Sequence, residues 1–142
     1  MAKSFDKRFI VGLVAAVILL SGALYAWNKP PSGIADQLEG KTFHLAMYKG
    51  ASVADGSNYT LSFQDGKLSA KFCNNMSGNY TLANSSLQGK LASTLKYCQT
   101  PAGLMDIENV FGAGIDKGLN VSYQGDTLKL TTAENVQFVF TK

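Results

Sequence analysis

Arginine is almost absent from this sequence, and its absence limits the partners that the protein can have. Among the 142 residues Arg8 is the only arginine, so the other basic residues are lysines. From Asn28 onward ten Lys face nine Asp and Glu, and they form no basic block. Phosphate binding by charge neutralisation needs clustered Lys and Arg. We therefore expect no nucleic-acid partner.

Histidine and cysteine are nearly as scarce, which argues against catalysis and metal binding. His44 is the only histidine, and Cys73 and Cys98 are the only cysteines. A cysteine nucleophile needs a nearby base to form its thiolate, and no pattern in the sequence brings His44 close to Cys73. These three residues would also leave a zinc ion without a fourth ligand. The sequence predicts a protein that is not an enzyme and binds no metal or cofactor.

The two cysteines leave two alternatives open. An even number of cysteines in an exported domain favours a disulfide, whereas a cytosolic domain would keep two free buried thiols. If Cys73 and Cys98 pair, the closed loop of about 26 residues would stabilise the fold by roughly 3–4 kcal/mol. The choice depends on the compartment, and the N-terminal residues indicate which compartment it is.

The N-terminal region has the pattern of a membrane segment. Residues 9–27, FIVGLVAAVILLSGALYAW, contain no charged side chain. At 1.5 Å per residue they would span about 28 Å as a helix, close to the thickness of a bilayer's hydrocarbon core. Lys3, Lys7 and Arg8 make residues 1–8 basic, and basic flanks stay in the cytoplasm. We expect a signal anchor that crosses the inner membrane once, with the C-terminal domain in the periplasm or the extracellular space.

A cleaved signal peptide is the alternative, and it would release the protein. Ser21, Gly22 and Ala23 supply the small residues of a cleavage site near Ala23. Ala23 also stands where a bacterial lipoprotein carries its lipid-bearing cysteine, so lipid attachment at this site is excluded. In either case Pro30 and Pro31 end the hydrophobic helix, and residues 28–37 are expected to form a linker.

Residues 38–142 are expected to form one domain that consists mostly of short strands. Tyr59, Leu61 and Phe63 alternate with polar residues, and Asp65-Gly66 follows them as a hairpin turn. Runs rich in Thr, Tyr, Phe, Leu and Val recur between turn residues, as in an all-β chain. The strand-like runs are 42–48, 59–63, 68–72, 80–82, 87–91, 94–98, 119–123, 127–131 and 136–140.

A single segment has the periodicity of a helix. Its apolar face contains residues spaced three and four apart, namely Leu104, Ile107, Phe111 and Ile115. Thr100 suits the N-cap, Pro101 the first helical position and Gly118 the end. Asp106 and Glu108, two positions apart, would point in different directions rather than form a catalytic pair. We predict an α+β fold, a curved antiparallel sheet of about eight short strands, sandwich- or barrel-like, with one packed helix.

A polar run inside the domain is the candidate binding site. It consists of Asn74, Asn75, Met76, Ser77 and Gly78. Asn and Gly tolerate positive φ, so we expect a bulge or tight corner here rather than a plain strand. A ligand could contact this corner, although Asn side chains more often satisfy the backbone of their own turn. Both interpretations stay open.

Five segments carry a resemblance to a known family. The central one is Phe72–Leu82, FCNNMSGNYTL, and the opening one is Leu38–Phe43, where Phe43 replaces a Trp. The others are Leu91–Cys98, Met105–Phe111, with Glu108 and Phe111 at characteristic places, and Gly125–Leu130. Taken in their order along the chain, these segments resemble the META domain family, which includes the bacterial heat-shock protein HslJ. The resemblance covers about residues 37 to 142.

This resemblance implies a fold and a broad role. The family has a curved antiparallel sheet with one helix, and no catalytic residues are established for it. Its bacterial members are mostly envelope proteins, linked to heat-shock or antibiotic stress and in some cases to virulence. We therefore expect a non-enzymatic, monomeric envelope domain that binds an envelope protein or has a structural role in stress tolerance. The alternative is a secreted inhibitor or virulence-associated protein on the same scaffold.

Overall fold

The structure is a computed structural model that describes residues 33–142. The predicted basic region 1–8, the membrane segment 9–27, the cleavage near Ala23 and the first part of the linker lie outside the described residues. Between residues 33 and 142, the helices are too short or too polar to span a lipid bilayer.

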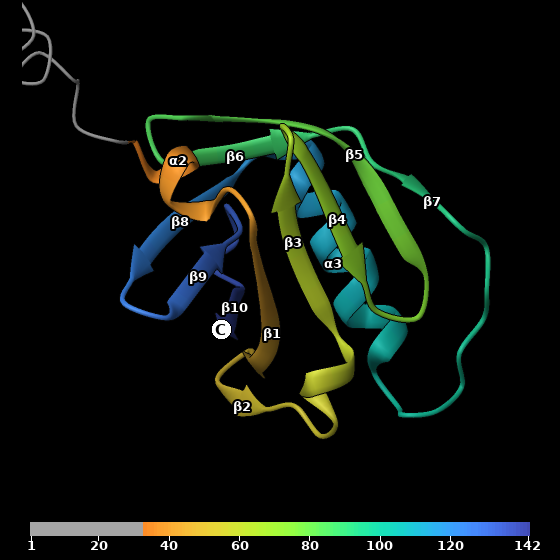
Figure 1. The fold of residues 1–142 in the computed structure, drawn as a ribbon. Coiled ribbons are helices and arrows are strands. Elements are labelled where there is room, and N and C mark those ends of the chain that lie inside the picture. Colours follow the sequence, from red (N-terminus) through yellow and green to blue (C-terminus); the bar gives the residue numbers. More distant parts are fainter. Residues whose placement is uncertain (1–32) are drawn as a thin grey trace, which may run out of the picture. The chain divides into compact units, whose positions relative to one another are not determined.

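Eight antiparallel strands form a ring that closes on itself (Figure 1). They are β1 (Lys41–Tyr48), β3 (Thr60–Gln64), β4 (Lys67–Lys71), β5 (Asn75–Ala83), β6 (Ser86–Gly89), β8 (Leu119–Gln124), β9 (Thr127–Thr131) and β10 (Gln137–Thr141). They pair in this order, and the pairing of β10 with β1 closes the barrel. Two shorter strands lie outside the ring, β2 (Ala51–Ser52) on β1 and β7 (Ala92–Ser93) on β5. The predicted curved antiparallel sheet is confirmed, and of the two predicted forms, sandwich-like or barrel-like, the structure has the barrel, with eight strands in the ring and two short strands added to it.

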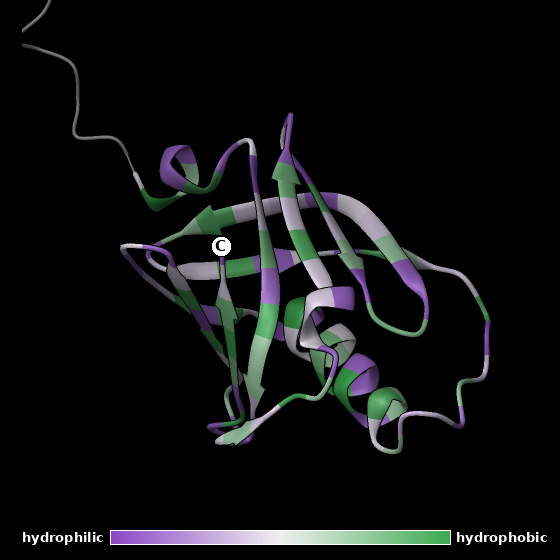
Figure 2. Ribbon diagram, turned by 60° about the horizontal axis from the view of Figure 1, so that its bottom comes forward, coloured by the Kyte–Doolittle hydropathy of each residue, from purple (hydrophilic) through white to green (hydrophobic). Residues whose placement is uncertain are grey.

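The alternation of apolar and polar residues decides which side of each strand faces the interior. Leu61 and Phe63 of β3 and Leu68 of β4 are fully buried, whereas the residues between them are not. Figure 2 shows this alternation as hydrophobic and hydrophilic bands along the strands. Asp65 and Gly66 join β3 to β4 with positive φ at both positions, as a two-residue hairpin requires. The local pattern therefore sets the register of this pair.

The helix α3 (Leu104–Lys117) packs against the barrel through the predicted apolar face. Phe111 is fully buried and makes edge-to-face contacts with Phe72, in the bend after β4, and with Phe138 of β10. Gly114 permits a close approach, because a Cβ at this position would lie 2.7 Å from Leu119 Cδ2. The helix therefore covers the core that the strands enclose.

The helix starts later than the sequence predicts. Thr100 and Pro101 were expected at its N-terminus, but the N-cap is Gly103, with a φ of 86°. This left-handed backbone conformation suits glycine and interrupts the helical path. Residues 101–104 form a separate turn instead, closed by the Leu104 N–H and the Pro101 carbonyl oxygen. The predicted end at Lys117 and Gly118 is confirmed.

The predicted linker also differs from the structure at its C-terminal end. Residues 34–37 belong, with Leu38, to the short helix α2 (Ile34–Leu38). Leu38 is fully buried in the core, and Ile34 packs partly against the same cluster. Because two apolar residues four apart share one face of a helix, burying both favours a helical turn. The compact unit accordingly begins at Gly33.

Candidate functional site

Asn74 is the buried centre of hydrogen bonding in the predicted binding corner. It is 3% exposed and precedes β5 in a bend of the chain. Its side-chain amide donates to the Lys96 carbonyl oxygen at 3.1 Å. Its Oδ1 accepts from the Lys96 backbone N–H at 2.6 Å and from the Thr94 hydroxyl at 2.9 Å. Asn74 therefore holds a segment of its own chain and is not available to an external ligand.

Glu108 of α3 binds Asn74 from the other side. One carboxylate oxygen accepts from the Asn74 backbone N–H and the other from its side-chain amide, each at 2.6 Å. Glu108 is only 6% exposed. Polar groups buried to this extent are stable only when their hydrogen bonds are made. The Asn74–Glu108 pair meets this requirement and connects the helix, the bend and the segment around Lys96.

Cys73 and Cys98 form a disulfide beside this pair. Their Cα atoms lie 5.9 Å apart, and both residues pack partly against the core. The chain has no free cysteine, so the structure selects the disulfide over two free thiols. The bond ties the bend at residue 73 to the end of the segment that Asn74 holds.

The rest of the predicted corner is not a corner. Asn75, Met76, Ser77 and Gly78 are the first residues of β5, and they pair in regular register with β4. Met76 points inward, whereas Asn75 and Ser77 are exposed. A Cβ on Gly78 would overlap the carbonyl oxygen of Lys90, so a close approach of two backbones requires this glycine. The prediction of a bulge was wrong here because local polarity does not reveal the neighbouring strands, and the bend is confined to residues 72–74.

Residues 94–97, here called the edge segment, follow β7 along the outside of the barrel (Figure 1). The sequence predicts a strand over 94–98, but the regular pairing ends at Ser93. Leu95 is 100% exposed and Tyr97 is 79% exposed. Within residues 33–142, the backbone N–H and C=O groups of Leu95 and Tyr97 make no hydrogen bond. The edge segment therefore presents two large apolar side chains and four free backbone groups.

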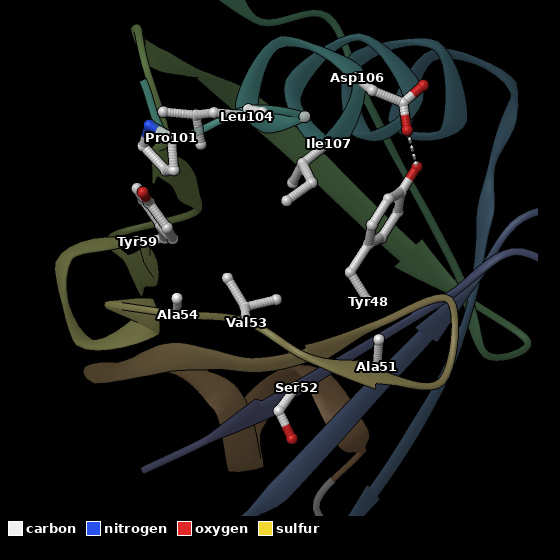
Figure 3. A pocket seen from close by; sticks show the side chains of 12 residues that line it. Tyr48, Ala51, Ser52, Val53, Ala54, Tyr59, Pro101, Leu104, Asp106 and Ile107 are labelled. Carbon is white, nitrogen blue, oxygen red and sulfur yellow. Dashed lines mark hydrogen bonds between the residues drawn. The ribbon is translucent and has the colours of Figure 1, made fainter. Parts of the chain in front are cut away.

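An apolar cleft lies between the loop after β1 and the start of α3 (Figure 3). Its volume is about 240 Å³. In Figure 3 Val53 and Ala54 lie on one side of it and Leu104 and Ile107 on the other, with Tyr48 and Tyr59 at its two ends. Residues from two regions of the chain that are distant in sequence, 48–59 and 101–107, form this cleft, so no local sequence pattern indicates it.

Hydrogen bonds and charge pairing organise the Tyr48 end of the cleft. The Tyr48 hydroxyl donates to Asp106 at 2.8 Å, and Lys49 Nζ lies 3.0 Å from the same carboxylate oxygen. The hydrogen bonds from Lys49 and Tyr48 lower the pKa of Asp106. Burial and the hydrogen bond to Asp106 raise the pKa of Tyr48. The polar groups at this end are therefore paired with one another.

A match to a known family of sequences identifies the family of this chain. The META domain family matches residues 36–142, which is most of the chain and almost all of the described residues. The chain belongs to the META domain family. The resemblance found in the sequence is thus confirmed. No curated protein matches the sequence significantly.

Solved structures share the fold of this META domain. One, described as an NMR structure of the protein, is 27% identical with a TM-score of 0.69, covering 78% of this chain and 95% of that chain. An NMR structure of a protein from Burkholderia xenovorans is 20% identical with a TM-score of 0.59, covering 80% and 91%. A crystal structure of a DUF4847 family protein from Bacteroides vulgatus is 11% identical with a TM-score of 0.58, covering 77% and 96%. The latter two likenesses concern the fold alone.

The titratable residues of this META domain do not gather into a metal site. Among residues 33–142, no three His, Cys, Asp or Glu side chains are placed to hold an ion together. His44 lies on β1, where its Nδ1 is 2.8 Å from the Ser57 carbonyl oxygen. The exposed pair Leu95 and Tyr97 was not recognised in the sequence as a surface feature. The sequence feature that indicates this pair is the spacing of Leu95 and Tyr97, which lie two positions apart in a run predicted to be extended.

We expect the Asp106→Asn variant to lose less stability in acid than the wild type. The pKa of Asp106 is lowered in the folded state, so its contribution is present above the pKa of the unfolded chain and is lost as the pH falls below about 4. The effect is small because Asp106 and Lys49 are half-exposed. Urea unfolding at pH 6 and pH 3 measures it. Asp126→Asn, which changes an exposed hairpin acid, is the control and should follow the wild type.

Proposed function

We propose that this META domain is a non-catalytic binding domain of the cell envelope that captures an extended segment of a partner protein. The partner segment would add to the edge segment as a further strand. The observation that carries the proposal is the combination of free backbone groups and exposed apolar side chains at Leu95 and Tyr97.

The topology supports strand addition at this position. A closed barrel offers no strand edge to another chain, but β7 and the edge segment lie outside the closed ring. The backbone of Thr94 and Lys96 faces β5 and Asn74. The backbone groups of Leu95 and Tyr97, at the alternate positions, therefore face away from the barrel. An extended partner can pair with these groups through main-chain hydrogen bonds.

The side chains indicate the chemistry of the partner. Only three large apolar residues are exposed in residues 33–142, and two of them, Leu95 and Tyr97, belong to this segment of four residues. Residues two apart in an extended chain lie on the same face. We infer that the partner segment carries apolar or aromatic residues at alternate positions, because these would cover Leu95 and Tyr97.

The edge segment is also held in place before a partner arrives. Asn74 binds Lys96 through two hydrogen bonds and Thr94 through a third, and the disulfide fixes Cys98 immediately after the segment. Ordering a flexible segment during binding would reduce the affinity. A segment that is already ordered avoids this loss, which favours a binding role over a passive loop.

The envelope location is part of the proposal. A disulfide is stable in an oxidising compartment, which is consistent with residues 9–27 anchoring the domain on the outer side of the inner membrane. A role in tolerance to heat or antibiotic stress would follow if the partner acts in the envelope. The alternative is a secreted inhibitor. N-terminal sequencing of the mature protein separates the two, since a start at Leu24 indicates release and an intact segment indicates an anchor.

Site-specific photocrosslinking in cells tests the strand addition. A photoreactive residue at position 97 is expected to crosslink one partner protein, whereas the same residue at the exposed Gln124 on β8 is not. Leu95→Pro removes a backbone N–H that is free in the unbound domain but is needed by an added strand. We expect this variant to reduce the crosslink at least tenfold and to leave the unfolding free energy almost unchanged.

Two further measurements decide the interpretation. Leu95→Ile keeps the N–H and an apolar side chain, so it should retain the crosslink. With the purified partner, the amides of Leu95 and Tyr97 should become protected from hydrogen exchange. An undiminished crosslink in Leu95→Pro would contradict strand addition. A crosslink to a second copy of this chain would show self-association and overturn the proposal of a separate partner.

A further inference from the structure

We propose that the apolar cleft is a second binding site, independent of the edge segment, for a small flat aromatic compound of bicyclic size. The compound would carry one N–H or O–H group that hydrogen-bonds to Tyr59.

The size of the cleft sets the size of the ligand. A closed apolar cavity of about 150 Å³ binds benzene, and the cleft has a volume of about 240 Å³. It is therefore large enough for two fused rings. It is smaller than the clefts of roughly 300–1,000 Å³ that hold drug-sized molecules, so a larger ligand would extend into solvent.

The walls favour a flat apolar group. Val53 and Ala54 from the loop after β2 face Leu104 and Ile107 from α3, and Figure 3 shows no charged side chain between them. Ile107 is buried and Val53 is half-buried against the core, so neither wall is free to collapse into the space. A ring inserted between two such walls would bury both of its faces.

Tyr59 supplies an unused hydrogen-bonding group. The residue is 6% exposed, and its backbone is fixed by bonds to Leu45 and Gly56. Its hydroxyl makes no hydrogen bond within residues 33–142, and Figure 3 shows it at the side of the cleft where Pro101 lies. Burial and the charge of Asp55 raise the pKa of Tyr59, so the neutral phenol can both donate and accept. The hydroxyl is not a buried unpaired group, so a ligand N–H or O–H at this end would bind it in place of solvent.

The opposite end of the cleft does not compete for the polar group of the ligand. The Tyr48 hydroxyl already donates to Asp106, and Lys49 pairs with the same carboxylate. These three groups satisfy one another, so a ligand gains little by displacing them. Of the two tyrosine hydroxyls at the ends of the cleft, Tyr48 is paired and Tyr59 is not, which gives a ring with a single N–H a preferred orientation.

Indole and indene test the proposal, because they have the same shape and only indole carries an N–H. The full chain in lipid nanodiscs is titrated with each compound while backbone amide shifts are followed by NMR. We expect indole to shift the amides of Val53, Ala54, Gly103 and Leu104 in a saturable way. Val53→Trp fills the cleft and should abolish these shifts. Because compound dissolved in the lipid affects this variant and the wild type equally, the variant also provides the baseline for that effect.

Tyr59→Phe separates the hydrogen bond from the apolar contact. This variant should weaken indole binding about fivefold, the value of one ordinary hydrogen bond, and should leave indene binding unchanged. Leu95→Ser, in the edge segment, should bind both compounds like the wild type. Saturable shifts elsewhere, or unaltered indole binding by a folded Val53→Trp variant, would exclude the cleft. Equal weakening of indole and indene by Tyr59→Phe would exclude the assigned role of the hydroxyl.

Discussion

Replacing Cys73 and Cys98 together with alanine is expected to lower the unfolding free energy by about 3.5 kcal/mol. The disulfide joins residues separated by 25 positions. Closing a loop of this length lowers the entropy of the unfolded chain, and this raises the free energy of the unfolded chain by about 3.5 kcal/mol at 25 °C. For a domain of this size the loss corresponds to a fall in Tm on the order of 15 °C. A loss of this size is a large part of the stability of a small domain.

Denaturant unfolding with and without reductant measures this contribution. The double variant should unfold at the same denaturant concentration in both conditions, and the reduced wild type should approach it. The alanines occupy partly buried positions, so the reduced wild type also separates the lost bond from the lost sulfur atoms. A double variant within 1 kcal/mol of the oxidised wild type would mean that the Asn74 hydrogen bonds alone hold this region.

The barrel strands were predictable because each depends on a local pattern. Leu61 and Phe63 alternate with polar residues, Asp65-Gly66 allows the hairpin, and the residues expected at 119–123 and 127–131 form β8 and β9. The apolar face of α3 was predictable for the same reason. Closure of the ring by β1 and β10 was not, because it joins the two ends of the domain, and no local pattern specifies such a pair.

The candidate sites were harder to predict because their partners are distant in sequence. Asn74 belongs to a polar run that indicates an exposed turn, yet it can be buried because Glu108, 34 residues away, accepts hydrogen bonds from its backbone N–H and its side-chain amide. Asn75 has the same side chain and is exposed. The two asparagines can be told apart only by the residues that surround them in the fold. The cleft likewise exists only in the folded domain, where the loop after β1 lies next to the start of α3, and these two segments are distant in the sequence.

Replacing Asn74 with alanine is expected to lower the unfolding free energy by about 3 kcal/mol, although the change removes only a small polar side chain. The side chain makes four hydrogen bonds, to Glu108, Thr94 and twice to Lys96. Its loss leaves one Glu108 oxygen buried without a donor, and an unsatisfied buried group of this kind is costly. Urea unfolding measures the loss.

The neighbouring asparagine provides a matched control. Asn75→Ala changes the same side chain at an exposed position of β5, where the hydrogen bonds are made by the backbone N–H and C=O groups, both to Thr94, and not by the side chain. It should alter stability by less than about 0.5 kcal/mol. Equal losses in the two variants would mean that the buried network contributes nothing beyond strand propensity.

An aspartate at position 74 tests the network further, because it keeps the shape of asparagine and replaces the amide with a carboxyl group. That group would face Glu108 and the Lys96 carbonyl oxygen, which both need a donor. We expect Asn74→Asp to be less stable than Asn74→Ala at pH 7, and to recover part of the difference in acid, where a protonated carboxyl can donate. Because the same bonds hold the edge segment, both variants should also weaken capture of the partner at position 97, whereas Asn75→Ala should not. A variant that loses the network but keeps full capture would show that the edge segment does not need to be ordered before it binds.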